Sequence, residues 1–314
     1  MNSGVIFDER LRMRRTTTSA AAADVLSNRD ILTAPYGKGY AELEARTGRA
    51  FPNVRFALNY LPVANDGAHH DFLRRLSSDF IRDNAATMRT IRDEAASHAT
   101  KVFARDGETD LMAELVVPFV ENMVEKLSGT VFTLSPSMVF DHNLSLRKRL
   151  TLEAEFGRVI THIRETFPQD SEDRVGIRLA FAILGTDATL GTFGNSLREV
   201  LKPADGQPLN ALDWSDDLVA TGVPFILRDD VQAGTADRIY VDMTRFVAGN
   251  EPKPAAIFGV GAHTCLGRGF AQGAWRDLVG VLRGIDRPVW FVSSHSPDLR
   301  IFDVPQALTI RIGS

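Results

Sequence analysis

The stretch Phe258-Gly-Val-Gly-Ala-His-Thr-Cys-Leu-Gly267 decides how the rest of this chain is interpreted. It contains Cys265, the only cysteine among the 314 residues, in a loop that also carries three glycines. Residues 268–283 follow with apolar side chains at helical spacing, which predicts a helix that begins directly after the loop. The thiol is therefore expected in a glycine-rich loop at the N-terminus of a helix.

This position has chemical consequences for a thiol. The first turn of a helix leaves backbone N–H groups without partners, and the helix dipole favours negative charge there. We therefore expect the pKa of Cys265 to fall and its thiolate to be stabilised. The glycines also let a flat molecule approach the main chain closely. Such a thiolate can be a nucleophile or a metal ligand, whereas the alternative for a lone cysteine is a buried and inert side chain.

The pattern resembles the haem-binding loop of the cytochrome P450 family, Phe-Gly-x-Gly-x-His-x-Cys-x-Gly, at every fixed position. On average residue usage, a chance match in a chain of this length is on the order of one in a million. The resemblance implies that Cys265 is the axial thiolate of a haem iron, a ligand that favours O–O cleavage. It also implies that the loop contacts the haem through Phe258, Gly259, Gly261, Gly267 and His263, the last at a propionate.

A second motif lies in Asp66-Gly-Ala-His-His-Asp-Phe-Leu-Arg-Arg-Leu76. His70 and Arg74 are four residues apart and share one face of a predicted helix. They resemble the family's His-x-x-x-Arg motif, which binds a haem propionate, and the planar fork of arginine matches a carboxylate. The alternative is a solvated helix face, but two motifs that agree favour propionate binding.

Residues 171–201 predict one long, largely buried helix with Ser171 as its cap. Its middle, Leu184-Gly-Thr-Asp-Ala-Thr189, resembles the family's central helix over the haem, where the usual string is Ala/Gly-Gly-x-Asp/Glu-Thr. Gly185 and Asp187 match, and the resemblance makes them candidate catalytic residues. We expect Asp187 to lie in the pocket rather than to face water.

The threonine of this motif is displaced by one residue in the present sequence. Ala188 stands where threonine is usual, and Thr189 follows one residue later. One residue is a rotation of about 100° on a helix, so Thr189 can replace the usual threonine only if the helix is bulged. Thr189 is retained as a third catalytic candidate.

The family's Glu-x-x-Arg pair is missing. Aligning Val223-Pro-Phe-x-x-Arg228 with the similar string of the family puts Ser215 and Leu218 where the pair belongs. Arg228 itself is retained, and the resemblance implies that it binds a propionate. We expect Asp216 or Asp217 to hold Arg238 in place of the missing pair.

Glu155 and Arg158 have the spacing of that pair but precede the central helix. We interpret them as unrelated to it.

Composition is ordinary for a soluble globular protein: 44% hydrophobic, 24% charged and a net charge of −4. Mixed charges argue against nucleic-acid binding, and a single cysteine fits a reducing cytoplasm. The sequence contains no apolar run long enough to cross a membrane and no signal peptide at its N-terminus, so a cytoplasmic location is expected.

The predicted fold is mostly α, a single cytochrome P450-like helical domain over 1–314 with reduced β content. We expect 1–60 to be divergent, with the N-terminal sheet region truncated, and the resemblance to start near residue 60. Further expected elements are a helix at Ser19–Leu26, a turn at Pro35–Gly39, helices over 79–106 and 110–129, and a strand pair in the tail, 286–314.

The resemblance implies haem b as cofactor and oxidation of a small organic substrate in a biosynthetic pathway. It also implies that electrons come from a ferredoxin or flavodoxin-type partner. The departures keep alternatives open: a peroxide-dependent or non-oxidative haem-thiolate enzyme acting by dehydration, isomerisation or nitrogen-oxide chemistry, or a non-catalytic haem-binding partner protein. A homodimer is also open, because a chain with few strands can cover an exposed sheet edge by pairing.

Overall fold

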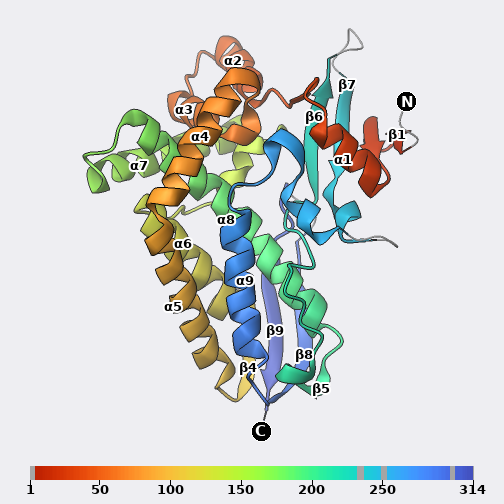
Figure 1. The fold of residues 1–314 in the computed structure, drawn as a ribbon. Coiled ribbons are helices and arrows are strands. Elements are labelled where there is room, and N and C mark those ends of the chain that lie inside the picture. Colours follow the sequence, from red (N-terminus) through yellow and green to blue (C-terminus); the bar gives the residue numbers. More distant parts are fainter. Residues whose placement is uncertain (1–3, 232–236, 249–252, 298–300, 314) are drawn as a thin grey trace.

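The computed structural model describes residues 4–231, 237–248, 253–297 and 301–313. Most of these residues are helical (Figure 1). The predicted helix at Ser19–Leu26 and the long helix after Ser171 are both present. The helices are α1 (Ser19–Ser27), α2 (Tyr36–Thr47), α3 (Pro52–Tyr60), α4 (Gly67–Asp83), α5 (Ala85–Phe103), α6 (Val117–Ser128), α7 (Leu146–Thr166), α8 (Glu172–Leu201) and α9 (Arg268–Leu282).

Two sheets lie at opposite ends of the helical body, one beside α1 and one where the C-terminus lies (Figure 1). The larger has the order β1-β2-β7-β6-β3 and the smaller β4-β9-β8-β5. In the tail, the predicted strand pair is confirmed as the antiparallel β8–β9. The strands are β1 (Val5–Asp8), β2 (Met13–Thr16), β3 (Ile31–Thr33), β4 (Gly107–Asp110), β5 (Asp205–Pro208), β6 (Phe225–Asp230), β7 (Asp237–Asp242), β8 (Pro288–His295) and β9 (Ala307–Ile312).

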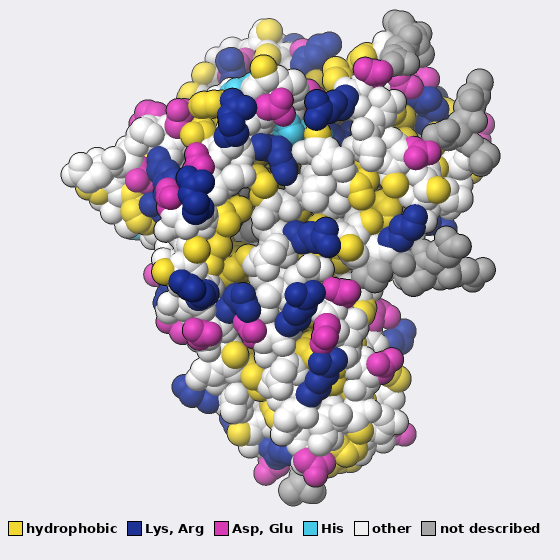
Figure 2. Space-filling view, viewed as in Figure 1, with side chains coloured by type: hydrophobic (Ala, Val, Ile, Leu, Met, Phe, Trp, Pro, Cys, Tyr) yellow, Lys and Arg dark blue, Asp and Glu magenta, His cyan; other side chains and the backbone are white. Residues whose placement is uncertain are grey.

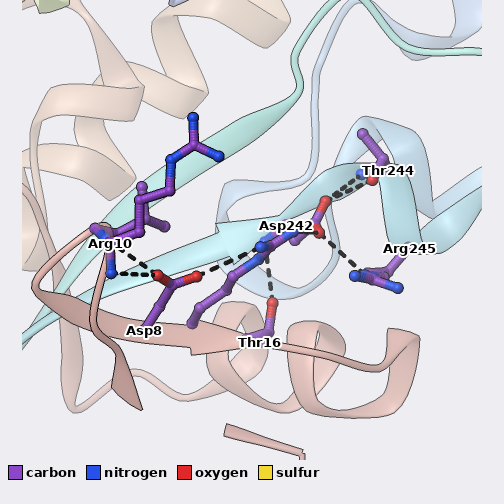
Figure 3. A network of polar contacts seen from close by, with 8 residues as sticks. Asp8, Arg10, Thr16, Asp242, Thr244 and Arg245 are labelled. Carbon is purple, nitrogen blue, oxygen red and sulfur yellow. Dashed lines mark hydrogen bonds and ion pairs between the residues drawn. The ribbon is translucent and has the colours of Figure 1, made fainter. Parts of the chain in front are cut away.

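The N-terminal region corrects our expectation of a truncated sheet. Residues 5–33 supply three of the five strands in the larger sheet, and β2 pairs in parallel with β7. The carboxylate of Asp242 holds this junction (Figure 3): it accepts hydrogen bonds from Arg15 Nη2 at 2.8 Å and Arg245 Nε at 3.0 Å. The N–H of Asp242 donates to Thr16 Oγ1 at 2.9 Å. The N-terminal hairpin is thus fastened to the segment that leads into the cysteine loop.

Other expected boundaries also changed. The turn predicted at Pro35–Gly39 is wrong, because α2 begins at Tyr36 and runs through both glycines. The stretch 79–106 is divided between α4 and α5, which meet at Asn84. The helix predicted over 110–129 begins later, with a π-helical turn at Met112–Val116, and ends as predicted at Gly129 in the left-handed conformation.

Helix α8 is the centre of the fold. Ser171 caps it by accepting from the N–H of Arg174, and 17 of its 30 residues are buried. Leu197 and Phe193 belong to one apolar core, whereas Leu179 and Ile183 belong to another. A helix that is apolar on most sides has to be covered on most sides, so α8 joins the two cores.

Charges are mixed on the surface. Acidic and basic side chains are interspersed across the face shown in Figure 2. Within the described parts of the chain, no helix is long and apolar enough to cross a bilayer.

Backbone that packs directly against α8 at Gly191 predicts a large effect on stability from adding one methyl group there. A Cβ at Gly191 would lie 2.4 Å from the carbonyl oxygen of Asp303 and 2.7 Å from the Cα of Gly222, both backbone atoms that cannot rotate away. We expect Gly191→Ala to lower the free energy of unfolding by at least about 2 kcal/mol. Thermal and urea unfolding measure the loss.

Gly280→Ala is the matched control for this change. Gly280 is exposed on α9 and a Cβ there meets nothing within 4 Å, so the gain in helix propensity, about 1 kcal/mol, is unopposed. Equal stability of the two variants would contradict the packing described here.

Candidate functional site

The cysteine loop joins a 3₁₀ turn, Pro254–Phe258, to α9. The N–H of Cys265 donates to the carbonyl of Phe258 at 2.7 Å and closes the loop. Gly259 and Gly261 have φ values of 76° and 73°, which side chains rarely adopt. A Cβ at Gly261 would also lie 2.9 Å from the Cα of Ser27, at the end of α1. These two glycines therefore serve the conformation of the loop and its packing against α1.

The thiol of Cys265 faces a cavity and corrects our expectation of its pKa. Cys265 is exposed to this cavity, but the protein around it separates the thiol from bulk water and so raises the pKa of Cys265, which outweighs the lowering by the N–H groups of Gly267 and Arg268 and by the charge of Arg74. The predicted influence of the helix terminus is present but smaller than the cost of burying a charge. A cation bound at the sulfur would favour the thiolate. A Cβ at Gly267 would lie 3.6 Å from the sulfur, in ordinary contact.

A cavity of about 440 Å³ separates the cysteine loop from α8. This volume lies within the range of small-molecule and cofactor sites. Its walls are mainly apolar, with aromatic side chains from several elements. Phe258, Cys265 and Gly267 line one side, and α8 lines another through Leu184, Gly185, Ala188, Thr189 and Thr192.

Three predicted propionate residues, His70, Arg74 and His263, line one end of this cavity. The two imidazole rings lie 4.2 Å apart between centroids. His263 Nε2 lies 3.4 Å from Asp66 Oδ1, and Arg74 donates to the carbonyl of Thr264 at 2.7 Å. His70 Nε2 and His263 Nδ1 are buried without a hydrogen-bond partner among the described residues. Helix α4 and the cysteine loop thus bring unsatisfied nitrogens together.

Arg228 of β6 is the fourth predicted propionate residue; it is not among the residues that line the cavity, but its charge is near enough to His263 to lower the pKa of that imidazole. The residue is 2% exposed, and neither Nη1 nor Nη2 has a hydrogen-bond partner in the part of the chain described. Burial lowers the pKa of Arg228, although the charge of Asp66 raises it in part. A buried cation without a partner is costly, so this residue indicates an anionic ligand.

The catalytic candidates divide between two faces of α8. Gly185 and Thr189 line the cavity, and α8 is α-helical from Glu172 to Leu201, so the bulge that would put Thr189 at the place of Ala188 is not present. Asp187 is buried, as predicted, but it is not among the residues that line the cavity. Its Oδ2 accepts hydrogen bonds from Ser135 Oγ at 2.6 Å and from the N–H of Ser137 at 3.2 Å. The expectation of a pocket carboxylate is therefore corrected.

The proposed replacement for the missing Glu-x-x-Arg pair is also wrong. Arg238 pairs with Asp229 at 2.9 Å, its direct neighbour across the β6–β7 hairpin. Asp216 instead accepts from Arg283 at 2.6 Å, and Asp217 lies 3.5 Å from Arg276. Side chains at α9 and its C-terminal end therefore contact the loop at 214–217 directly.

Trp275 of α9 reinforces that hold. Its indole N–H donates to the carbonyl of Ser215 at 3.0 Å, and the side chain is fully buried. The loop that would carry the missing pair is thus attached to the helix that follows Cys265.

Sequence reasoning missed two residues at the rim of the cavity, Tyr36 and His142. Their rings stack with centroids 5.2 Å apart. Burial raises the pKa of Tyr36 to about 12 and lowers the pKa of His142. Neither residue stands in a recognisable motif, and 106 positions separate them, so no local signal identifies the contact.

The donors and the sulfur fit a haem. A flat macrocycle with two carboxylates would bring ligands to the unsatisfied nitrogens of His70, His263 and Arg228. Its iron would meet Cys265 Sγ, and the apolar walls suit its ring. The propionates would accept from the Nη atoms of Arg228 and, with the rings protonated, from His70 Nε2 and His263 Nδ1, which are otherwise buried without partners among the described residues.

A scan of known protein families and a search of curated proteins find no match. Solved structures do match. CalO2 is similar with a TM-score of 0.78 at 15% identity, over 99% of this chain and 93% of CalO2. P450BioI, in complex with an acyl carrier protein ligated to hexadec-9Z-enoic acid, is similar with a TM-score of 0.74 at 14% identity, over 99% of this chain and 96% of P450BioI. P450 RauA, complexed with a biosynthetic intermediate of aurachin RE, is similar with a TM-score of 0.70 at 14% identity, over 100% of this chain and 94% of P450 RauA. The likeness therefore includes the first 60 residues, contrary to our expectation.

Replacing Arg228 should change two measured quantities in different ways, the melting temperature of the haem-free protein and the affinity for hemin. We expect Arg228→Met to leave the melting temperature of the haem-free protein unchanged or higher, because an unpaired buried charge is removed. Its affinity for hemin should fall by about tenfold or more, because a charged donor to carboxylate is lost. Calorimetry and hemin titration measure the two effects.

Arg238→Met is the control on the neighbouring strand. It leaves the buried carboxylate of Asp229 without its ion pair, so stability should fall clearly while hemin affinity stays within about twofold. A lower melting temperature with unchanged hemin affinity in Arg228→Met would show that Arg228 has a purely structural role.

Proposed function

We propose that this chain, which has the cytochrome P450 fold, is a haem-thiolate oxidoreductase that acts on a small, mainly apolar organic molecule. One observation carries the proposal: a single thiol and two buried histidine nitrogens without hydrogen-bond partners among the described residues, those of His70 and His263, border one apolar cavity. Two of the similar structures, P450BioI and P450 RauA, hold a fatty acyl group on a carrier protein and a biosynthetic intermediate, respectively. These support an apolar substrate, and a biosynthetic role is part of the proposal.

Each residue of the site has a defined task in this proposal. Cys265 ligates the iron, and His70, Arg74, Arg228 and His263 hold the propionates. Haem b, bound in this way, supplies the oxidising chemistry, and its thiolate ligand favours O–O cleavage. The protein orients the substrate and excludes water with the apolar walls of the cavity.

The α8 wall favours a second candidate function. Ala188 lines the cavity where an alcohol is usual, and the carboxylate of Asp187 binds Ser135 instead. An acid–alcohol pair that delivers protons to bound dioxygen is therefore not assembled at these positions. A peroxide, which already carries its protons, does not need that pair, so peroxide-dependent oxidation is the alternative. For the dioxygen reaction we propose a ferredoxin or flavodoxin-type protein as electron donor.

The absorption spectrum tests the proposal. We expect the purified protein, loaded with hemin, reduced and exposed to carbon monoxide, to give the strongly red-shifted Soret band of a thiolate-ligated haem. Cys265→Ala should abolish that shift. Thr186→Val is the control, because the Thr186 hydroxyl bonds only within α8, to the carbonyl of Ala182 at 2.6 Å.

Two outcomes would contradict the proposal. The first is no hemin uptake by the unmodified protein. The second is an identical band in Cys265→Ala, which would move the ligand elsewhere. Turnover of a fatty-acid probe with hydrogen peroxide, compared with turnover by reduced protein and dioxygen, then decides between the two oxidants.

A further inference from the structure

We propose that residues 133–144, called the wall segment, form a fixed boundary of the cavity that selects substrates, and that Asp187 is the positioning residue on α8 that holds it. The wall segment passes through the 3₁₀ turn Pro136–Phe140 between α6 and α7. The inference rests on the proposed function only in taking the cavity as the substrate site.

The end of the wall segment is part of the cavity surface. Phe140, Asp141, His142 and Asn143 all line the cavity. Phe140 is buried, so its ring cannot leave the cavity wall without exposing apolar surface. The position of these side chains therefore limits the shape of the molecule that can enter.

Asp187 fastens the beginning of the 3₁₀ turn to α8. One oxygen, Oδ2, accepts both the Ser135 hydroxyl and the Ser137 N–H. Asp187 is 6% exposed, so water does not compete freely for these bonds. Hydrogen bonds to a carboxylate are roughly twice as strong as neutral ones.

Further anchors fix both ends of the wall segment. Glu155 of α7 accepts from the N–H of Thr133 at 2.6 Å, while pairing with Arg158 at 2.7 Å. Arg149 of α7 donates to three carbonyl groups near the other end, those of Asp141, His142 and Leu144.

Tyr36 of α2 completes these anchors on the cavity side. Its ring packs edge-on against Phe140 at 5.1 Å and stacks on His142. A segment held at this many points along twelve residues opens rarely, so it acts as a boundary and not as a freely moving loop.

Asp187 lies on a face of α8 that does not line the cavity, which favours a role in holding the wall segment over a role in proton transfer. Gly185, Ala188 and Thr189 line the cavity, whereas Asp187 lies between them in sequence and does not. Its bonded oxygen faces the wall segment. The structure thus assigns Asp187 to positioning, with no contact to the reacting atoms.

Asp187→Asn and Asp187→Ala separate the two roles. Asparagine keeps an oxygen that can accept both bonds but cannot act as an acid, whereas alanine removes the tether. We expect hydrogen exchange of the amides of 135–141 in the haem-free protein to rise about tenfold or more in Asp187→Ala. Asp187→Asn and the neighbouring control Thr186→Val should stay within about twofold of the unmodified protein. If Asp187→Ala does not fold, Ser135→Ala removes one of the two bonds and should raise exchange by a smaller factor.

Ligand binding tests the effect on the cavity. Two probes are used: N-phenyl-1-naphthylamine in the haem-free protein and 4-phenylimidazole in the haem-loaded protein. Both should bind about fivefold more weakly to Asp187→Ala and equally well to Asp187→Asn. If the unmodified protein takes up no haem, the proposed function fails, while exchange and the naphthylamine probe still decide whether the wall exists.

Two outcomes would overturn the proposal. Unchanged exchange of 135–141 in Asp187→Ala would show that the tether does not hold the wall segment. Loss of turnover in haem-loaded Asp187→Asn, with exchange and probe binding intact, would show that Asp187 acts as an acid.

Discussion

The need to cover α8 on nearly every side organises this molecule. Thirty residues of mostly apolar helix cannot remain in water, and the helix belongs to both apolar cores. One face is covered by α6, another by α3 and α7, and the backbone at Gly222 and Asp303 approaches it directly at Gly191. The cavity lies along a stretch of α8 that contains Gly185 and Ala188, where small side chains leave space. The site is thus the one side of the helix that packing leaves uncovered.

Sequence reasoning succeeded where the signal was contiguous. The cysteine loop before a helix and the long helix α8 were recognised, because each depends on a short motif, a helical spacing or an apolar run, whereas the propionate role of His70, Arg74, Arg228 and His263 stays a prediction. The N-terminal strands were not recognised, because β2 is a four-residue strand, Met-Arg-Arg-Thr, without alternating polarity, and its partner lies more than 220 residues away. The expectation for Asp187 failed for a related reason. A turn of about 100° per residue shows that Asp187 and Thr189 face different ways, but not which of them faces the cavity.

The loss of the Glu-x-x-Arg pair has a counterpart in the structure. The loop at 214–217 has its own attachments to α9, through the buried Trp275 and the more exposed Arg276 and Arg283. Exposed ion pairs contribute little, so the buried indole is the stronger of these attachments. The helix that follows the thiol is therefore supported by aromatic packing in place of a buried ion pair. Its position depends on close packing along α9, where Trp275, Leu278 and Val279 are all buried.

The Asp242 junction also determines the order in which the chain can fold. Arg15 and Thr16 are more than 220 residues from their partner Asp242 at the end of β7. The larger sheet therefore cannot close until the hairpin of β1 and β2 meets β7 across that separation. Contacts of such long range make folding slow, because a large loop has to close before the contact forms.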